Sequence, residues 1–158
     1  MKKWISLSMM SLLFGVSTVT WSAGQARVDT ASIHERFVGA WRLAWLEEPG
    51  ADGEVHQVDC TGLLVYTRDG HMSVQVMYRS PRSSSSASAV QYAQGGYEAS
   101  YGRYEIDGTH TFTFHVEGAL VRTLVGKDLK RVYELSGNRL MVKSPDPNEH
   151  WRVMWERE

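Results

Sequence analysis

A histidine and a glutamate two positions apart are the residues of this sequence with the clearest potential for chemistry. His115 and Glu117 belong to the stretch TFTFHVEG at 111–118, whose alternation predicts a β-strand with both side chains on one face. Inside a confined cavity such a pair could share a proton, orient a polar ligand group, or act as acid and base. On an outer face it would be a solvated strand surface, with the phenylalanines of the opposite face in the core. Alternation alone favours this outer placement.

Arg131 is a cation on an otherwise apolar face. It shares that face of the predicted strand 128–135 with Tyr133 and two leucines. An unpaired buried charge is too costly to keep, so Arg131 is either the partner of a carboxylate or the anchor of an anionic ligand head group. Glu117, on the neighbouring strand, is the candidate carboxylate.

Aromatic and neutral side chains complete the set of candidate ligand contacts. Gln75 would orient a polar ligand group if its strand face, shared with Met77, turned inward, and the sequence leaves the choice of face open. Tyrosines and tryptophans would supply an aromatic wall that suits a flat or long apolar molecule. The expected ligand-binding residues are Trp45, Tyr66, Gln75, Met77, Tyr101, His115, Glu117, Arg131, Tyr133 and Trp151.

The elements that must position these residues are short strands separated by turn signals. Segments rich in Val, Tyr, Thr, Trp, Leu and Phe predict eight strands, at 37–47, 54–67, 71–78, 97–106, 110–117, 128–135, 138–144 and 150–157. Gly62, inside the second strand, indicates a bulge or a sharp bend. The second, fourth and sixth connections are tight, and the others are mostly longer. We therefore expect an all-β fold, an eight-stranded antiparallel up-and-down barrel with short turns at one end and long loops at the other.

One tryptophan, Trp41, is expected at the closed end of this barrel. A short helix predicted at 30–36 runs into the first strand, where Gly39 lets the backbone approach the indole closely. The last strand finishes at the same end with Arg157, whose guanidinium could lie on the indole face. We expect Gly39, Trp41 and Arg157 to be structural, with the N-terminal helix closing this end.

Five segments in order resemble a family of bacterial lipocalin-like proteins, within the wider lipocalin and calycin group. They are FVGAWRLAW at 37–45, LLVYTRDGHMSVQVM at 63–77, YGRYEIDG at 101–108, HVEGAL at 115–120 and ELSGNRL at 134–140. The resemblance implies a lipocalin-type barrel over essentially the whole mature chain. Because HVEG is among the family's distinctive segments, the resemblance also favours an inward His115. The sequence departs from the family pattern at Ser100, Phe114 and 121–123.

The first 22 residues have the organisation of a secretory signal peptide. Two lysines precede a loosely apolar run, which is followed by small residues. Serines interrupt the run, which makes it a poor membrane span. We expect residues 1–22 to be removed, leaving a lipocalin-like barrel domain at 23–158 without an integral membrane segment. The protein would be exported, either periplasmic or secreted.

Composition argues against several classes of function. The chain carries 17 basic and 18 acidic residues. Without the two lysines of residues 1–22, 15 basic residues would face 18 acidic ones, a net charge of −3. The mature chain has no basic run, so a nucleic-acid partner is not expected. Cys60 is the single cysteine, and the histidines lack ligand spacing, so we expect no metal and no cofactor.

Three functions remain open from the sequence. The favoured hypothesis is binding of a small, largely apolar or amphipathic molecule in the barrel, outside the cytoplasm and without catalysis. The second is an isomerase- or cyclase-type enzyme that uses His115 and Glu117 as an acid–base pair in the same cavity. The third is a barrel filled by its own side chains that acts as an interaction protein.

Overall fold

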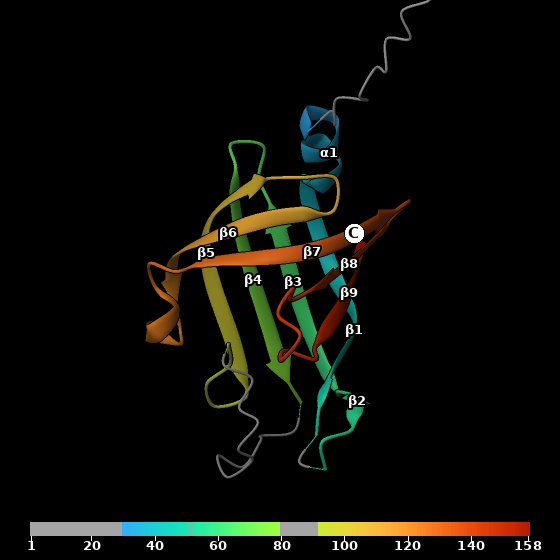
Figure 1. Cartoon of the computed structure of the whole chain (residues 1–158), viewed down its shortest axis with the longest axis vertical. Coiled ribbons are helices and arrows are strands. Elements are labelled where there is room, and N and C mark those ends of the chain that lie inside the picture. Colours follow the sequence, from blue (N-terminus) through green and yellow to red (C-terminus); the bar gives the residue numbers. More distant parts are fainter. Residues whose placement is uncertain (1–29, 51, 80–91) are drawn as a thin grey trace, which may run out of the picture.

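The computed structural model describes residues 30–50, 52–79 and 92–158. The predicted signal peptide, residues 1–22, and the expected start of the mature domain at residue 23 lie outside this part of the chain. The described elements are shown in Figure 1. They are α1 (Thr30–Phe37), β1 (Gly39–Pro49), β2 (Val55–Gln57), β3 (Cys60–Tyr66), β4 (His71–Tyr78), β5 (Tyr97–Ile106), β6 (Thr111–Ala119), the 3₁₀ turn η1 (Arg122–Leu124), β7 (Asp128–Ser136), β8 (Arg139–Lys143) and β9 (Arg152–Arg157).

Eight of these strands close into an antiparallel up-and-down barrel, which confirms the predicted fold class. The order is β1-β3-β4-β5-β6-β7-β8-β9, and β1 pairs with β9 to complete the ring. The segment predicted as one strand at 54–67 is two strands. The first of them, β2, pairs with the end of β1 at Glu47–Pro49, and the second, β3, takes the predicted place in the barrel.

The two ends of the barrel differ as the loop lengths predict. α1 and the tight β3–β4 turn lie at one end, and the β1–β2 connection lies at the opposite end (Figure 1). Phe37, the last residue of α1, is fully buried. Its ring packs edge-on against the rings of Tyr66 and Tyr133, with centroids 5.0 and 4.9 Å away. The helix therefore closes the barrel by inserting an aromatic side chain.

The predicted contact between Trp41 and Arg157 is present at this closed end. Trp41 is 0% exposed, and its indole N–H donates to the Phe37 carbonyl oxygen at 2.8 Å. The Arg157 guanidinium carbon lies 4.3 Å from the centre of the Trp41 ring, and its Nη1 donates to the Val38 carbonyl oxygen at 2.7 Å. Gly39 has φ +138°, and a Cβ there would lie 2.8 Å from Nη1 of Arg157. A side chain at position 39 would thus displace the arginine.

Two register shifts change which side chains face inward. One lies in β1 between Leu43 and Trp45, and the other lies between β5 and β6, at Tyr101 and Gly102. Of the bulge or sharp bend predicted at Gly62, the bulge is absent from the pairing of β3 with β4, which runs through Gly62 without interruption. Gly62 instead allows close packing, since a Cβ there would lie 2.6 Å from the Gln75 carbonyl oxygen.

Candidate ligand-binding cavity

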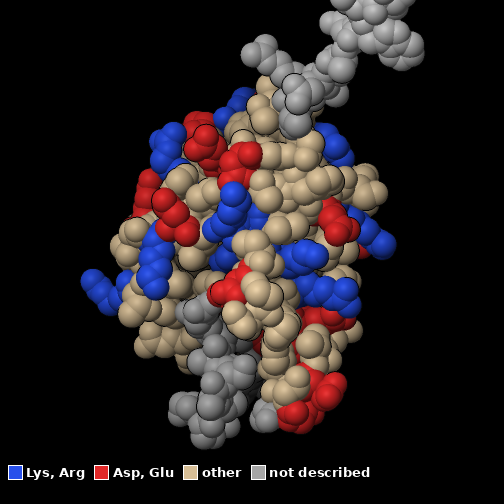
Figure 2. All heavy atoms as spheres, viewed as in Figure 1, with Lys and Arg blue, Asp and Glu red and all other residues tan. Residues whose placement is uncertain are grey.

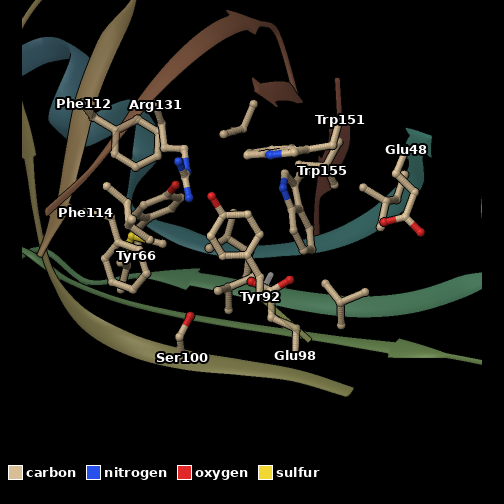
Figure 3. A pocket seen from close by; sticks show the side chains of 18 of the residues that line it. Glu48, Tyr66, Tyr92, Glu98, Ser100, Phe112, Phe114, Arg131, Trp151 and Trp155 are labelled. Carbon is tan, nitrogen blue, oxygen red and sulfur yellow. The ribbon is translucent and has the colours of Figure 1, made fainter. Parts of the chain in front are cut away.

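The interior of the barrel contains a cavity lined mainly by apolar and aromatic side chains (Figure 3). The volume of this cavity is about 90 Å³. The apolar and aromatic lining residues are Leu46, Leu64, Met72, Val74, Val76, Tyr78, Tyr92, Phe112, Phe114, Leu129, Val142, Trp151, Val153 and Trp155, and the remaining ones are Glu48, Tyr66, Glu98, Ser100 and Arg131.

Arg131 brings a positive charge into this apolar space. It lies on the inner face of β7, opposite Phe112 of β6, and only 9% of the residue is exposed. Its Nη1 donates to the Lys130 carbonyl oxygen at 3.1 Å. The guanidinium carbon lies 5.1 Å from the ring centres of both Tyr92 and Trp151. Within the described residues, Arg131 forms no ion pair with a carboxylate, so the predicted pairing with Glu117 is wrong.

The Tyr66 hydroxyl is a second polar group in the cavity. Tyr66 is 1% exposed, and among the residues that the structure describes its hydroxyl oxygen has no hydrogen-bond partner. Burial raises the pKa of Tyr66 well above its ordinary value, with a contribution from Tyr104 and an opposing one from the charge of Arg131. The phenol therefore stays protonated and can donate a hydrogen bond to a bound group.

Two carboxyl groups line the cavity from the side of the long loops. Glu48, at the end of β1, is 2% exposed and accepts a hydrogen bond from the Tyr78 hydroxyl at 3.2 Å. Glu98, the second residue of β5, is partly buried. Burial raises the pKa of Glu98 to about 7; the charge of Arg131 opposes this rise, and Glu48 adds to it. Glu98 is therefore divided between its neutral and charged forms near neutral pH.

A hydrogen-bonded cluster holds the aromatic rings beside Arg131. The Tyr92 hydroxyl and the Trp151 indole N–H both donate to the Glu149 carboxylate, at 3.0 and 3.1 Å. Partial burial raises the pKa of Glu149, but hydrogen bonds from Ser144, Trp151 and Tyr92 and the charge of Arg131 outweigh it, so the net pKa is lowered. The ionised Glu149 thus fixes the two rings that contact the guanidinium.

The cavity contains only some of the residues that the sequence suggested for it. Tyr66, Arg131 and Trp151 line it. Tyr133 faces inward but lies in the closed-end core, 2% exposed and packed against Phe37. Tyr66, Arg131 and Trp151 are therefore placed to touch a molecule in the cavity, whereas Tyr133 packs in the core at the closed end.

His115 and Glu117 face the outside of the barrel, which corrects the expected inward orientation. The inner face of β6 carries Phe112, Phe114 and Val116, each no more than 4% exposed. The Nδ1 atom of His115 instead lies 2.7 Å from an oxygen of Asp128, an exposed residue on the adjoining strand. Burying the phenylalanines removes more apolar surface from water than burying His115 would, and this decides the orientation.

Four further residues expected in the cavity are also outside it. Gln75, Met77 and Tyr101 are exposed on the outer faces of β4 and β5, where the inner positions are taken by Met72, Val76 and other apolar residues. Trp45 lies outside because the extra residue in β1 reverses the alternation after Leu43. Its ring packs under Arg152, whose guanidinium carbon is 5.6 Å away.

Several cavity residues were missed by the sequence analysis. Glu98 and Ser100 share the inner face of β5 with Tyr104, so the alternation of that strand was the signal that could have found them. Glu48 turns inward only because of the shift in β1. Tyr92 lies outside every predicted strand, and its place against Arg131 has no local signal.

The described residues contain neither a cluster suited to a metal ion nor a membrane-spanning helix. No three His, Cys, Asp or Glu side chains there are grouped so as to hold a metal ion. No helix in that part has the length and apolar character of a membrane span. On the face shown in Figure 2, basic and acidic side chains are interspersed rather than gathered by sign.

Comparison with known proteins agrees with this barrel. A family model described as a lipocalin-like domain matches residues 38–157. The chain belongs to the lipocalin-like domain family. A lipocalin-like barrel with an internal cavity suits a ligand-binding role in general and fits the binding of a small molecule. No curated protein matches the chain.

Solved structures similar to this lipocalin-like chain share low sequence identity with it. A lipocalin-like protein from Bacteroides uniformis is 15% identical, with a TM-score of 0.46 over 78% of this chain and 99% of that one. An uncharacterized protein from Bacteroides eggerthii is 15% identical, with a TM-score of 0.46 over 77% and 99%. A redesigned β-barrel is 10% identical, with a TM-score of 0.42 over 79% and 94%.

Proposed function

We propose that this lipocalin-like barrel binds a small, largely apolar molecule in its cavity, outside the cytoplasm and without converting it. The observation that carries the proposal is a cavity enclosed by the barrel strands whose wall is formed mainly by apolar and aromatic side chains. Such a lining is typical of small-molecule sites, with a few polar groups that fix orientation. Export rests on the predicted signal peptide at 1–22.

The volume of the cavity limits the size of the ligand. About 90 Å³ is well below the roughly 300–1,000 Å³ of pockets that hold drug-sized molecules. The ligand that fits best is therefore a small, compact molecule. This bound distinguishes the proposal from the binding of long polyenes or whole lipids.

Binding rather than catalysis is proposed because the candidate acid–base pair is not in the cavity. His115 and Glu117 project from the outer surface of β6, where a molecule inside the barrel does not reach them. The His115→Ala variant should therefore bind any cavity ligand as well as the wild type does.

Calorimetry with octan-1-ol and octanoate tests the proposal, because each molecule combines an apolar chain with one polar end, as the lining of the cavity favours. At least one should bind the wild type at a single site. Val76→Phe, which enlarges a side chain that lines the cavity, should weaken that binding at least about tenfold, the effect of losing roughly 1.4 kcal/mol. The matched control is Leu63→Phe at an exposed position of the neighbouring strand. Failure of both molecules to bind, or equal binding to Val76→Phe, would instead support the filled-barrel hypothesis.

A further inference from the structure

We infer that the ligand of this cavity is an organic anion whose carboxylate binds Arg131, with the Tyr66 hydroxyl as a second donor. The inference rests on the proposed function and names the chemical class of the ligand. It would make Arg131 the residue that selects the head group, and the apolar wall the surface that receives the rest of the molecule.

The surroundings of Arg131 leave its charge to be met by a ligand. The residue is 9% exposed, and among the described residues it forms no ion pair. Its neighbours are a backbone carbonyl oxygen, the ring faces of Tyr92 and Trp151, and the Tyr92 hydroxyl. Its charge also lowers the pKa of Glu149, which Tyr92 contacts through that hydroxyl. Ring faces stabilise a cation, but they do not replace the solvation lost on burial. A carboxylate would complete the site, since the planar guanidinium donates to both of its oxygens.

Tyr66 supplies an independent observation. Its hydroxyl is buried, lines the cavity and has no acceptor in the described part of the chain. A buried donor without an acceptor costs free energy in the empty protein. Figure 3 shows Arg131 and Tyr66 at the same side of the cavity as Phe112. The charge of Arg131 also lowers the pKa of Tyr66 against the larger effect of burial. An anion beside Arg131 could therefore accept from both.

The acidic residues of the cavity favour a cation less strongly than Arg131 favours an anion. Burial brings the pKa of Glu98 to about 7, so that this carboxyl group is partly neutral near neutral pH. Glu48 is already engaged by the Tyr78 hydroxyl. A cationic ligand is therefore the alternative that the binding experiment must distinguish from an anionic one.

Three probes of equal length separate these cases: octanoate, octan-1-ol and octan-1-amine, titrated by calorimetry at pH 7.5. The proteins are the wild type, Arg131→Met, Tyr66→Phe and Arg152→Gln. Arg152 is the matched control, because it is an exposed arginine that pairs with Glu47 on the outside of the barrel. Thermal unfolding of each variant checks its fold. Tyr66→Phe should be at least as stable as the wild type, since it removes a hydroxyl without an acceptor.

We expect octanoate to bind the wild type roughly 10- to 100-fold more tightly than octan-1-ol, the usual gain from hydrogen bonds to a charged group. Arg131→Met should abolish this preference while retaining octan-1-ol binding, Tyr66→Phe should reduce it, and Arg152→Gln should leave it unchanged. If Arg131→Met does not fold, Tyr66→Phe carries the test. Equal affinity for octanoate and octan-1-ol, or a preference for octan-1-amine, would overturn the inference and leave the proposed function intact. Binding of none of the three would overturn both.

Discussion

The partly buried carboxyl group of Glu98 makes a sharp prediction about stability and pH. Glu98→Gln replaces the carboxyl by a neutral group of nearly the same shape. Burial raises the pKa of Glu98 from 4.5 to about 7, with Arg131 opposing the rise and Glu48 adding to it. The folded protein therefore binds more protons than the unfolded chain between these two values. The stability that Glu98 contributes is present below pH 4.5 and is lost as the pH rises to about 7.

The size of this effect follows from the width of the pH window between the two pKa values, 4.5 and about 7. Each pH unit within it is worth about 1.4 kcal/mol, so the whole window of about 2.5 pH units is worth at most about 3.5 kcal/mol. Glu98 keeps some exposure to solvent, and water screens its charge. We therefore expect about 1–2 kcal/mol after this discount. Glu98→Gln should nearly match the wild type at pH 4 and be more stable by that amount at pH 8.

Urea unfolding followed by tryptophan fluorescence measures the difference. Other titrating groups cancel when the wild type and the variant are compared at the same pH. Glu105→Gln is the matched control for removal of a carboxylate, because Glu105 is exposed on the same strand. A Glu98→Gln difference that is the same at pH 4 and pH 8 would refute the argument that burial of this carboxyl governs its pKa.

Other predictions concern the scaffold and export. Trp41→Ala should lower the free energy of unfolding by about 3–5 kcal/mol, and a double-mutant cycle with Arg157→Ala should give a coupling of at least about 0.5 kcal/mol; additive losses would argue against the stacked pair. Gly102→Ala should destabilise by about 1–3 kcal/mol in urea unfolding, because a Cβ there would lie 2.0 Å from the His115 carbonyl oxygen; an unchanged midpoint would contradict this contact. Intact mass of the protein from the extracytoplasmic fraction should correspond to loss of residues 1–22, and a full-length mass would contradict export by cleavage.

The sequence was sufficient to predict the architecture of the barrel. Strands β4 and β5 have the bounds that alternation and turn residues predicted. This worked because period-2 alternation, glycine turns and loop length are properties of the chain over a few residues. The contact between Trp41 and Arg157 was also predictable, since the direction of the first and last strands in an up-and-down barrel brings their ends together.

Which face of β6 is buried was harder to predict, because two signals in the sequence disagreed. The alternation of β6 favoured burial of Phe112 and Phe114, and the structure agrees with it. The family segment that contains His115 favoured the opposite face, but a sequence segment that is typical of a fold does not say which way its polar residues point. Hydrophobic burial decided the face.

Tertiary structure alone decided the composition of the cavity. The extra residue in β1 turns Trp45 outward and Glu48 inward, and no turn residue in the sequence marks it. The charge of Glu48 acts on Glu98 only because closure of the barrel places β1 and β5 around the same cavity. Burial in that cavity is the main cause of the raised pKa of Glu98. Arg131 was visible in the sequence as a charge on an apolar face. Whether it met a carboxylate or the rings of Tyr92 and Trp151 depended on long-range packing, because those partners lie far from it along the chain.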